Sequence, residues 1–181
     1  SSDVCSSDLA AAVLLIDAGD FGHDYTVDMS FGNAVAWGDF DGDGFDDLAI
    51  GAFGVMVNGF AFAGRVFVVP GSAAGFDFAR AVTLDQNTKH VADKAEFEDL
   101  FGSELAVGDF NADGMDDLVV GSQRETIAGA LHAGSVHVFY GSPSGPRAKG
   151  SQYWHQNRPG IKDKCEPGES FGISFAVGDL N

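Results

Sequence analysis

Residues 38–48 read Gly38-Asp39-Phe40-Asp41-Gly42-Asp43-Gly44-Phe45-Asp46-Asp47-Leu48, a stretch that alternates acidic side chains with turn-forming glycines. It runs directly into the apolar residues Ala49 and Ile50, so it predicts a cation-binding loop that leads into a strand. The pattern returns at residues 108–118, and it begins a third time, at the same spacing, at residues 178–181, where the sequence stops. A fixed period of this length indicates a repeat architecture.

Phe-Gly pairs fix the register of the repeat, because Phe31-Gly32, Phe101-Gly102 and Phe171-Gly172 are evenly spaced along the sequence. The register predicts two complete units, at residues 31–100 and 101–170. Residues 10–30 are expected to end a preceding unit, with a strand over 10–17, and residues 171–181 to begin a truncated third one. Residues 1–9 match nothing later and are interpreted as a non-native or disordered leader. The sequence is therefore interpreted as a fragment.

Each unit contains four strand-like segments separated by glycine-rich turns. In the first unit they cover residues 33–38, 47–52, 65–69 and 81–85, which are rich in β-branched and aromatic residues. Only Ala92–Leu100 is expected to form a short helical turn. A four-stranded antiparallel sheet that recurs with so long a period predicts an all-β fold made of β-propeller blades.

The composition restricts the partners of the chain. The formal charge is −17, which disfavours nucleic acids and anionic membrane surfaces and favours cations. Apolar residues make up 45% of the sequence, so the acidity is not that of a disordered chain. The longest apolar run, residues 9–16, is too short to span a membrane, so no membrane insertion is expected.

The spacing within the acidic loops fits Ca²⁺, which takes six to eight oxygen ligands. Side chains at positions 1, 3 and 5 of a tightly curled loop converge, position 7 can offer its backbone carbonyl, and position 9 completes the set. The predicted ligands are Asp39, Asp41, Asp43, the Phe45 carbonyl and Asp47 in the first loop, Asp109, Asn111, Asp113, the Met115 carbonyl and Asp117 in the second, and Asp179 and Asn181 in the third.

Three alternatives compete with a calcium loop. An EF-hand requires a glutamate at position 12, where these loops have Ile50 and Val120 inside strands, so that interpretation fails. Acidic hairpin turns without an ion remain open, although four carboxylates within a single loop would repel one another. Mg²⁺ is the weaker candidate because it keeps more of its water ligands.

The Phe-Gly pairs, the Asp-x-Asp-x-Asp-Gly-x-x-Asp loop and the 70-residue period together resemble the FG-GAP repeats of the integrin α-subunit β-propeller and its bacterial relatives. The Gly-Ala-Pro of that family is weakened here to Gly51-Ala52-Phe53 and Gly121-Ser122-Gln123. The resemblance covers about residues 10–181. It implies a seven-bladed propeller on an extracellular or cell-surface protein, with Ca²⁺ in the hairpin loops.

The resemblance implies a module for adhesion or ligand recognition in which Ca²⁺ braces the loops between strands. Its partner is expected to be a protein or carbohydrate bound at the propeller face. The alternative is the non-catalytic propeller part of a secreted hydrolase or lyase, phospholipase D-like or polysaccharide-active. No catalytic constellation is recognised in the sequence: the five histidines are scattered, and Cys165 has no paired histidine nearby in the sequence.

Overall fold

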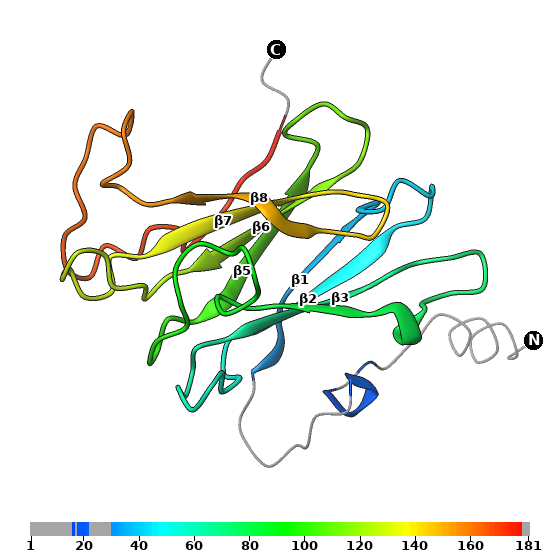
Figure 1. Ribbon diagram of the computed structural model, residues 1–181, viewed down its shortest axis with the longest axis horizontal. Helices are drawn as coiled ribbons and strands as arrows, with labels where there is room; N and C mark the ends of the chain where they lie inside the picture. The colour runs from blue at the N-terminus through cyan, green and yellow to red at the C-terminus, as the bar shows by residue number, and fades with distance from the viewer. Residues whose placement is uncertain (1–15, 17, 22–29, 179–181) are drawn as a thin grey trace, which may run out of the picture.

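The computed structural model describes residues 16, 18–21 and 30–178, which form two four-stranded antiparallel sheets (Figure 1). The first sheet contains β1 (Phe31–Gly38), β2 (Asp47–Ala52), β3 (Arg65–Val69) and β4 (Val82–Leu84) in chain order. The second contains β5 (Phe101–Gly108), β6 (Asp117–Ser122), β7 (Ser135–Tyr140) and β8 (Arg147–Trp154) in the same order. The expected all-β fold of repeated four-stranded blades is confirmed.

Most strand predictions agree with the structure, and one local prediction is wrong. The strands β2 and β3 have the predicted bounds, β1 begins two residues earlier, and β4 is shorter by one residue at each end. The helical turn expected at Ala92–Leu100 does not form, because Asp93, Glu98 and Leu100 all have positive φ values, from 58° to 75°. Short 3₁₀ helices lie instead at η1 (Ala18–Phe21) and η2 (Phe78–Arg80).

Two expectations fall on residues outside the described part of the chain. The leader at residues 1–9 lies there entirely. Of the strand predicted over residues 10–17, only Ile16 is described, and it packs against the apolar cluster of the first sheet.

The Phe-Gly pairs mark an irregularity at the start of the first strand of each sheet. Phe31 pairs with Ala52 but Val35 pairs with Ile50, so extra residues bulge out of β1, and β5 shows a similar shift after Phe101. The glycine of each pair has the positive φ that such a bulge favours.

Backbone atoms of the two sheets approach closely at this bulge. A Cβ atom on Gly51 in β2 would lie 2.1 Å from the Gly102 carbonyl oxygen in β5. The equivalent atom on Gly121 would lie 2.5 Å from the carbonyl oxygen of Gly172. The Phe-Gly of one unit therefore contacts the Gly-Ala or Gly-Ser of the unit before it, and glycine is required for the contact.

The loop between β2 and β3 joins the first sheet to the chain that leads into the second. The carbonyl groups of Ala61, Phe62 and Ala63 accept the N–H groups of Glu98, Leu100 and Phe101, at 3.1, 3.0 and 2.9 Å. The loop between β6 and β7 repeats these three bonds in the next unit, where the carbonyl groups of Leu131, His132 and Ala133 accept the N–H groups of Gly168, Ser170 and Phe171. The contact between units is thus a repeated backbone connection.

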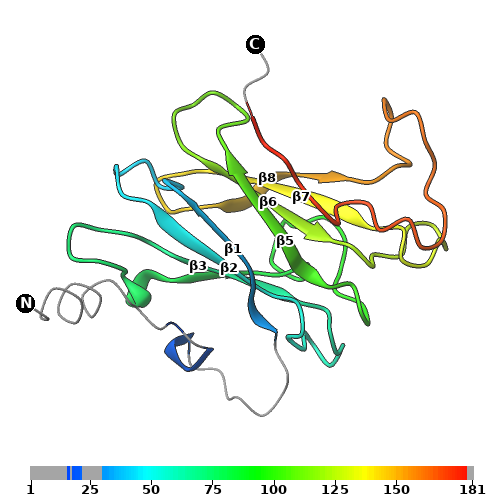
Figure 2. The same ribbon diagram turned by 180° about the vertical axis from the view of Figure 1, so that it is seen from behind.

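An apolar core fills the space between the two sheets. It joins Val66, Val68 and Leu84 of the first sheet to Leu118, Phe139 and further buried residues of the second. Both views place β5 beside β1, so the sheets lie face to face as neighbouring blades (Figures 1 and 2). This packing holds the acidic loops of the two units near one another.

Candidate metal centres

The loop between β1 and β2 folds around its own carboxylates. The two oxygens of Asp39 accept the backbone N–H groups of Asp43 at 3.0 Å and Gly44 at 2.9 Å. Asp41 Oδ1 accepts the same Asp43 N–H at 3.2 Å, and Asp43 Oδ1 accepts that of Phe45 at 2.9 Å. One ligand oxygen from each of the three aspartates lies within 4.8 Å of the others. The side chains at positions 1, 3 and 5 therefore converge.

The loop between β5 and β6 repeats this arrangement with a different sequence. Asp109 accepts the N–H groups of Asp113 at 3.2 Å and Gly114 at 2.9 Å. Asn111 Oδ1 accepts the Asp113 N–H at 2.8 Å, and Asp113 Oδ1 accepts the Met115 N–H at 3.0 Å. Because every bond has a counterpart in the first loop, Asn111 substitutes for Asp41 without changing the loop.

The aspartates at position 9 anchor the loops to the sheets. Asp47 is buried, and its Oδ1 and Oδ2 accept the N–H groups of Gly71 at 2.8 Å and Phe40 at 3.0 Å. Asp117 makes the corresponding bonds to Gly141 and Phe110, both at 2.9 Å. Burial raises the pKa of Asp47 to about 6 and raises that of Asp117 as well, while these N–H groups lower both. Each oxygen keeps a second lone pair, so metal ligation by these residues stays a prediction.

The other predicted ligands are not tested by the described contacts. Phe45 and Met115 lie at position 7 of loops with the expected shape, and the use of their carbonyl groups stays a prediction. Asp179 and Asn181 lie outside the described residues.

A basic side chain that the sequence did not predict contacts the first loop. Arg80, the last residue of η2, donates from Nη2 to Asp41 Oδ2 at 3.1 Å. The second unit has Gly150 in place of Arg80 and an uncharged Asn111 in place of Asp41. The first loop has four aspartates at its predicted ligand positions, and one of them, Asp41, pairs with Arg80. The second loop has three, so each loop keeps three aspartates that have no basic partner among the described residues.

A second unpredicted contact links the two loops. Asp116 donates its N–H to the Asp39 carbonyl oxygen at 2.9 Å and accepts the Asp39 N–H on Oδ2 at 3.0 Å. A Cβ on Gly38 would lie 2.8 Å from that carboxylate, so the contact requires glycine there. Asp46, the equivalent residue in the first loop, is exposed. The residue at position 8 of the second loop, Asp116, therefore links the second unit to the first.

The described residues fit a hard dication. The N–H groups of each loop hold the carboxylates in a fixed, converging arrangement, and oxygen is the donor that Ca²⁺ prefers. A bound ion would supply the positive charge that three carboxylates lack. These residues would position the ion and, by doing so, hold the β1–β2 and β5–β6 hairpins.

Cys165 has a histidine neighbour in space that its sequence context did not predict. Its Sγ lies 3.8 Å from His155 Nδ1. Burial, followed by the charge of Arg158, lowers the pKa of His155, so a neutral imidazole is favoured. The Cys165 N–H bond to Asn157 Oδ1 repeats the bond from Ala95 to Asn87 at the equivalent positions of the first unit. Cys165 and His155 therefore lie on a turn that also forms in the first unit, where Ala95 replaces the cysteine.

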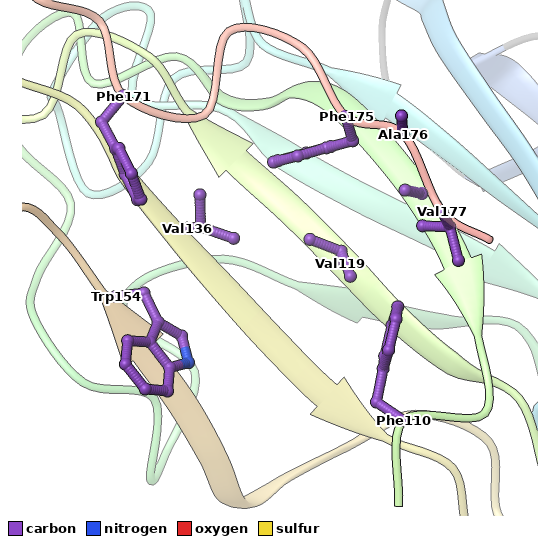
Figure 3. Close-up of a pocket in the computed structure, with 9 residues that line it drawn as sticks. Phe110, Val119, Val136, Trp154, Phe171, Phe175, Ala176 and Val177 are labelled. Atoms are coloured by element: carbon purple, nitrogen blue, oxygen red, sulfur yellow. The ribbon is translucent and has the colours of Figure 1, made fainter. Parts of the chain in front are cut away.

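An apolar cavity of about 300 Å³ opens on the second sheet, bordered by the first residues of the third unit (Figure 3). Its nine lining residues offer no carboxylate, imidazole or thiol. Most of these lining residues are equivalent, one unit later, to members of the core between the two sheets. They are Ala106, Phe110, Val119, Val136, Trp154, Phe171 and Phe175. The cavity on the second sheet therefore corresponds to the space on the first sheet that the second sheet fills.

Comparison with known proteins identifies the repeat. The FG-GAP repeat family matches residues 31–69 and 101–139. The chain is 35% identical over 124 residues to mouse phosphatidylinositol-glycan-specific phospholipase D, which covers 67% of this chain and 14% of that protein. It is 35% identical over 133 residues to Drosophila integrin alpha-PS2, which covers 67% of this chain and 8% of that protein.

A third relative extends the similarity over nearly the whole chain. The phosphatidylinositol-glycan-specific phospholipase D of Dictyostelium is 28% identical over 178 residues, which is 91% of this chain and 19% of that protein. The chain thus spans less than a fifth of the length of these relatives. Among the described residues, no helix has the length and apolar character needed to cross a membrane. The two matched segments coincide with β1–β3 and β5–β7, and the chain belongs to the FG-GAP repeat family.

Proposed function

We propose that the chain is a calcium-binding β-propeller module of an extracellular or cell-surface protein, used for adhesion or ligand recognition. The observation that carries the proposal is the convergence of Asp39, Asp41 and Asp43, with an equivalent set of bonds in the second loop. The ion neutralises the carboxylates and stiffens the hairpin between the first two strands of each sheet. Exposed loops of this kind suit the weaker binding of extracellular calcium modules, with Kd on the order of 10⁻⁴–10⁻³ M.

The ligand, a protein or a carbohydrate, is proposed to bind at the loops of residues 53–63 and 123–133. The backbones of these loops match, since Val57 and Phe60 form the same bridge as Ile127 and Ala130. Their exposed side chains differ, with Met56, Phe60 and Phe62 in the first loop and Leu131 in the second. A constant backbone with variable exposed apolar residues supports a recognition surface.

The similarity to phospholipases D supports a second candidate function. In it, the chain is the non-catalytic propeller part of a secreted hydrolase or lyase. Reading the gene beyond the present sequence separates the two, because a catalytic domain must be encoded there in the second case and not in the first.

A pair of variants tests the calcium sites. Asp43→Ala removes a converging carboxylate, whereas Asp46→Ala removes an exposed carboxylate of the same loop and serves as the control. Calcium binds the folded loop and not the unfolded chain, so at 100 times Kd each site contributes about 2.7 kcal/mol, or a rise of roughly 5–10 °C in Tm. Asp43→Ala should lose one site in isothermal titration and part of this rise, whereas Asp46→Ala keeps both. An equal response of the two variants, or no Tm difference between Ca²⁺ at 100 times Kd and chelator, refutes the proposal.

A further inference from the structure

A second group of acidic residues lies where the two sheets meet. One oxygen from each of Glu96, Asp99 and Glu125 falls within 4.8 Å of the others. Glu96 and Asp99 belong to the segment that leads into β5, and Glu125 lies in the loop after β6. Gln86 follows β4 and donates its Nε2 to Glu125 Oε2. These four residues are called the junction cluster.

The junction cluster is separate from the acidic loops. Glu125 follows the end of β6, whereas the loop of residues 109–117 precedes its start. The length of this extended strand separates the two ends by about 20 Å. An ion in the loop cannot therefore neutralise the cluster.

Three members of the junction cluster, Gln86, Asp99 and Glu125, are buried, whereas Glu96 is exposed. Asp99 and Glu125 are each 1% exposed. The charged groups that act on them are acidic, namely Asp93 and Glu96 on Asp99, and Asp99 and Asp93 on Glu125. The nearby Arg124 pairs instead with Glu98, at 3.1 Å. Burial first, and then these acidic neighbours, raise the pKa of Glu125 to about 9 and that of Asp99 to about 7.

Gln86 supplies an observation that is independent of the carboxylates. Its side chain is 1% exposed, and its Oε1 has no hydrogen-bond partner in the described structure, although its Nε2 contacts Glu125. An unpaired buried amide oxygen is unfavourable, and a cation at the cluster would satisfy it. Gln156, the equivalent residue of the next unit, also has a buried and unpaired Oε1.

The following unit repeats the arrangement around Gln156. Glu166 and Glu169 occupy the places of Glu96 and Asp99, and the Glu166 N–H donates to Glu169 Oε2 as that of Glu96 donates to Asp99. The first unit has Val55 in the place of Glu125. The combination of acids with a buried, unpaired amide oxygen is therefore a recurring feature of the junctions, completed in this chain by Glu125.

We propose that the junction cluster binds a divalent hard cation, Ca²⁺, between the two sheets, with the ligands Gln86 Oε1, Glu96, Asp99 and Glu125. Carboxylate and amide oxygens are the donors that Ca²⁺ selects, and water completes the coordination. The ion links β4 and the segment before β5 to the loop after β6. It therefore fixes the contact between neighbouring units rather than a hairpin within one unit.

Calcium counting by equilibrium dialysis and elemental analysis tests the proposal on the full chain. The double substitution Asp43→Ala and Asp113→Ala removes a ligand from each acidic loop, and the resulting chain should still bind one Ca²⁺. Adding Glu125→Gln should abolish that binding or weaken it at least tenfold. Glu98→Gln is the matched control, because it removes a carboxylate of the same segment that pairs with Arg124 outside the cluster.

The outcomes separate this proposal from the loop sites. If the loops bind nothing, the wild type still binds the junction ion, and Glu125→Gln alone removes it. Circular dichroism checks that each variant folds, and Gln86→Met, which removes only the amide, replaces Glu125→Gln if that variant unfolds. An unchanged calcium count in Glu125→Gln would overturn the proposal.

Discussion

Replacing Gly64 by alanine measures how strongly the two sheets depend on their close backbone contact. Gly64 has φ +91°, and an added Cβ would lie 2.1 Å from the Phe101 carbonyl oxygen. Gly59, in the same loop, also has φ +91°, but an added Cβ there meets nothing within 4 Å. Alanine at either position carries the same left-handed strain of about 1–2 kcal/mol. The difference between the two variants therefore isolates the contact with Phe101.

The extra cost at Gly64 follows from the bonds that must shift. Relief of the clash requires a movement that disturbs the bonds from Gly64 N–H to Val55 and from Phe101 N–H to Ala63, both 2.9 Å long. At about 1 kcal/mol for each bond, Gly64→Ala should cost about 2 kcal/mol more than Gly59→Ala.

Urea unfolding followed by tryptophan fluorescence gives the free energy of unfolding of both variants. The midpoint should fall much further for Gly64→Ala, with the slope m unchanged if the unfolding remains two-state. Free energies that agree within about 0.5 kcal/mol would refute the reasoning, because only surface effects have that size.

Two further predictions concern Arg80 and His137. Arg80→Ala should tighten Ca²⁺ binding at the first loop up to about fivefold in isothermal titration, because it frees Asp41 from a half-exposed ion pair; an equal or weaker affinity would count against this. Burial lowers the pKa of His137 to about 4, below the ordinary 6.5, so the folded state favours the neutral ring and stability is lost as pH falls from about 6.5 toward 4. His137→Phe, which copies Phe67 of the first unit, should avoid about 2–3 kcal/mol of this loss between pH 7 and 4.5 in urea unfolding. Parallel losses in both chains would exclude His137 as the cause.

The strand pattern could be predicted because it depends on local sequence and on the period. The bounds of β2 and β3 follow from short β-branched segments between glycines. The segment Ala92–Leu100 could not be predicted in the same way, because two of its left-handed residues, Glu98 and Leu100, are held by bonds to the distant loop between β2 and β3. Local helix propensity carries no information about that contact.

The acidic loops show the same division between local and distant information. Asp39, Asp41 and Asp43 converge through bonds within the loop, so their spacing was sufficient. Arg80 and Asp116 reach the first loop from distant parts of the sequence; Arg80 belongs to no motif, and the motif that contains Asp116 does not specify its contact with Asp39. The sequence does contain a trace of the junction cluster, because Gln86, Glu96 and Asp99 recur one unit later as Gln156, Glu166 and Glu169. Their spacing does not match that of a metal-binding loop, so the sequence alone did not predict a site there.

The three backbone bonds between the β2–β3 loop and the chain before β5 bear on how such proteins grow. Because they use only main-chain atoms and return in every described unit junction, a tandem duplication of one unit creates a copy that already fits its neighbour. The side chains of the loop at residues 53–63 are then free to diverge, provided that Gly64 and its equivalents persist. Gene duplication can therefore lengthen the array first and diversify its recognition loops later.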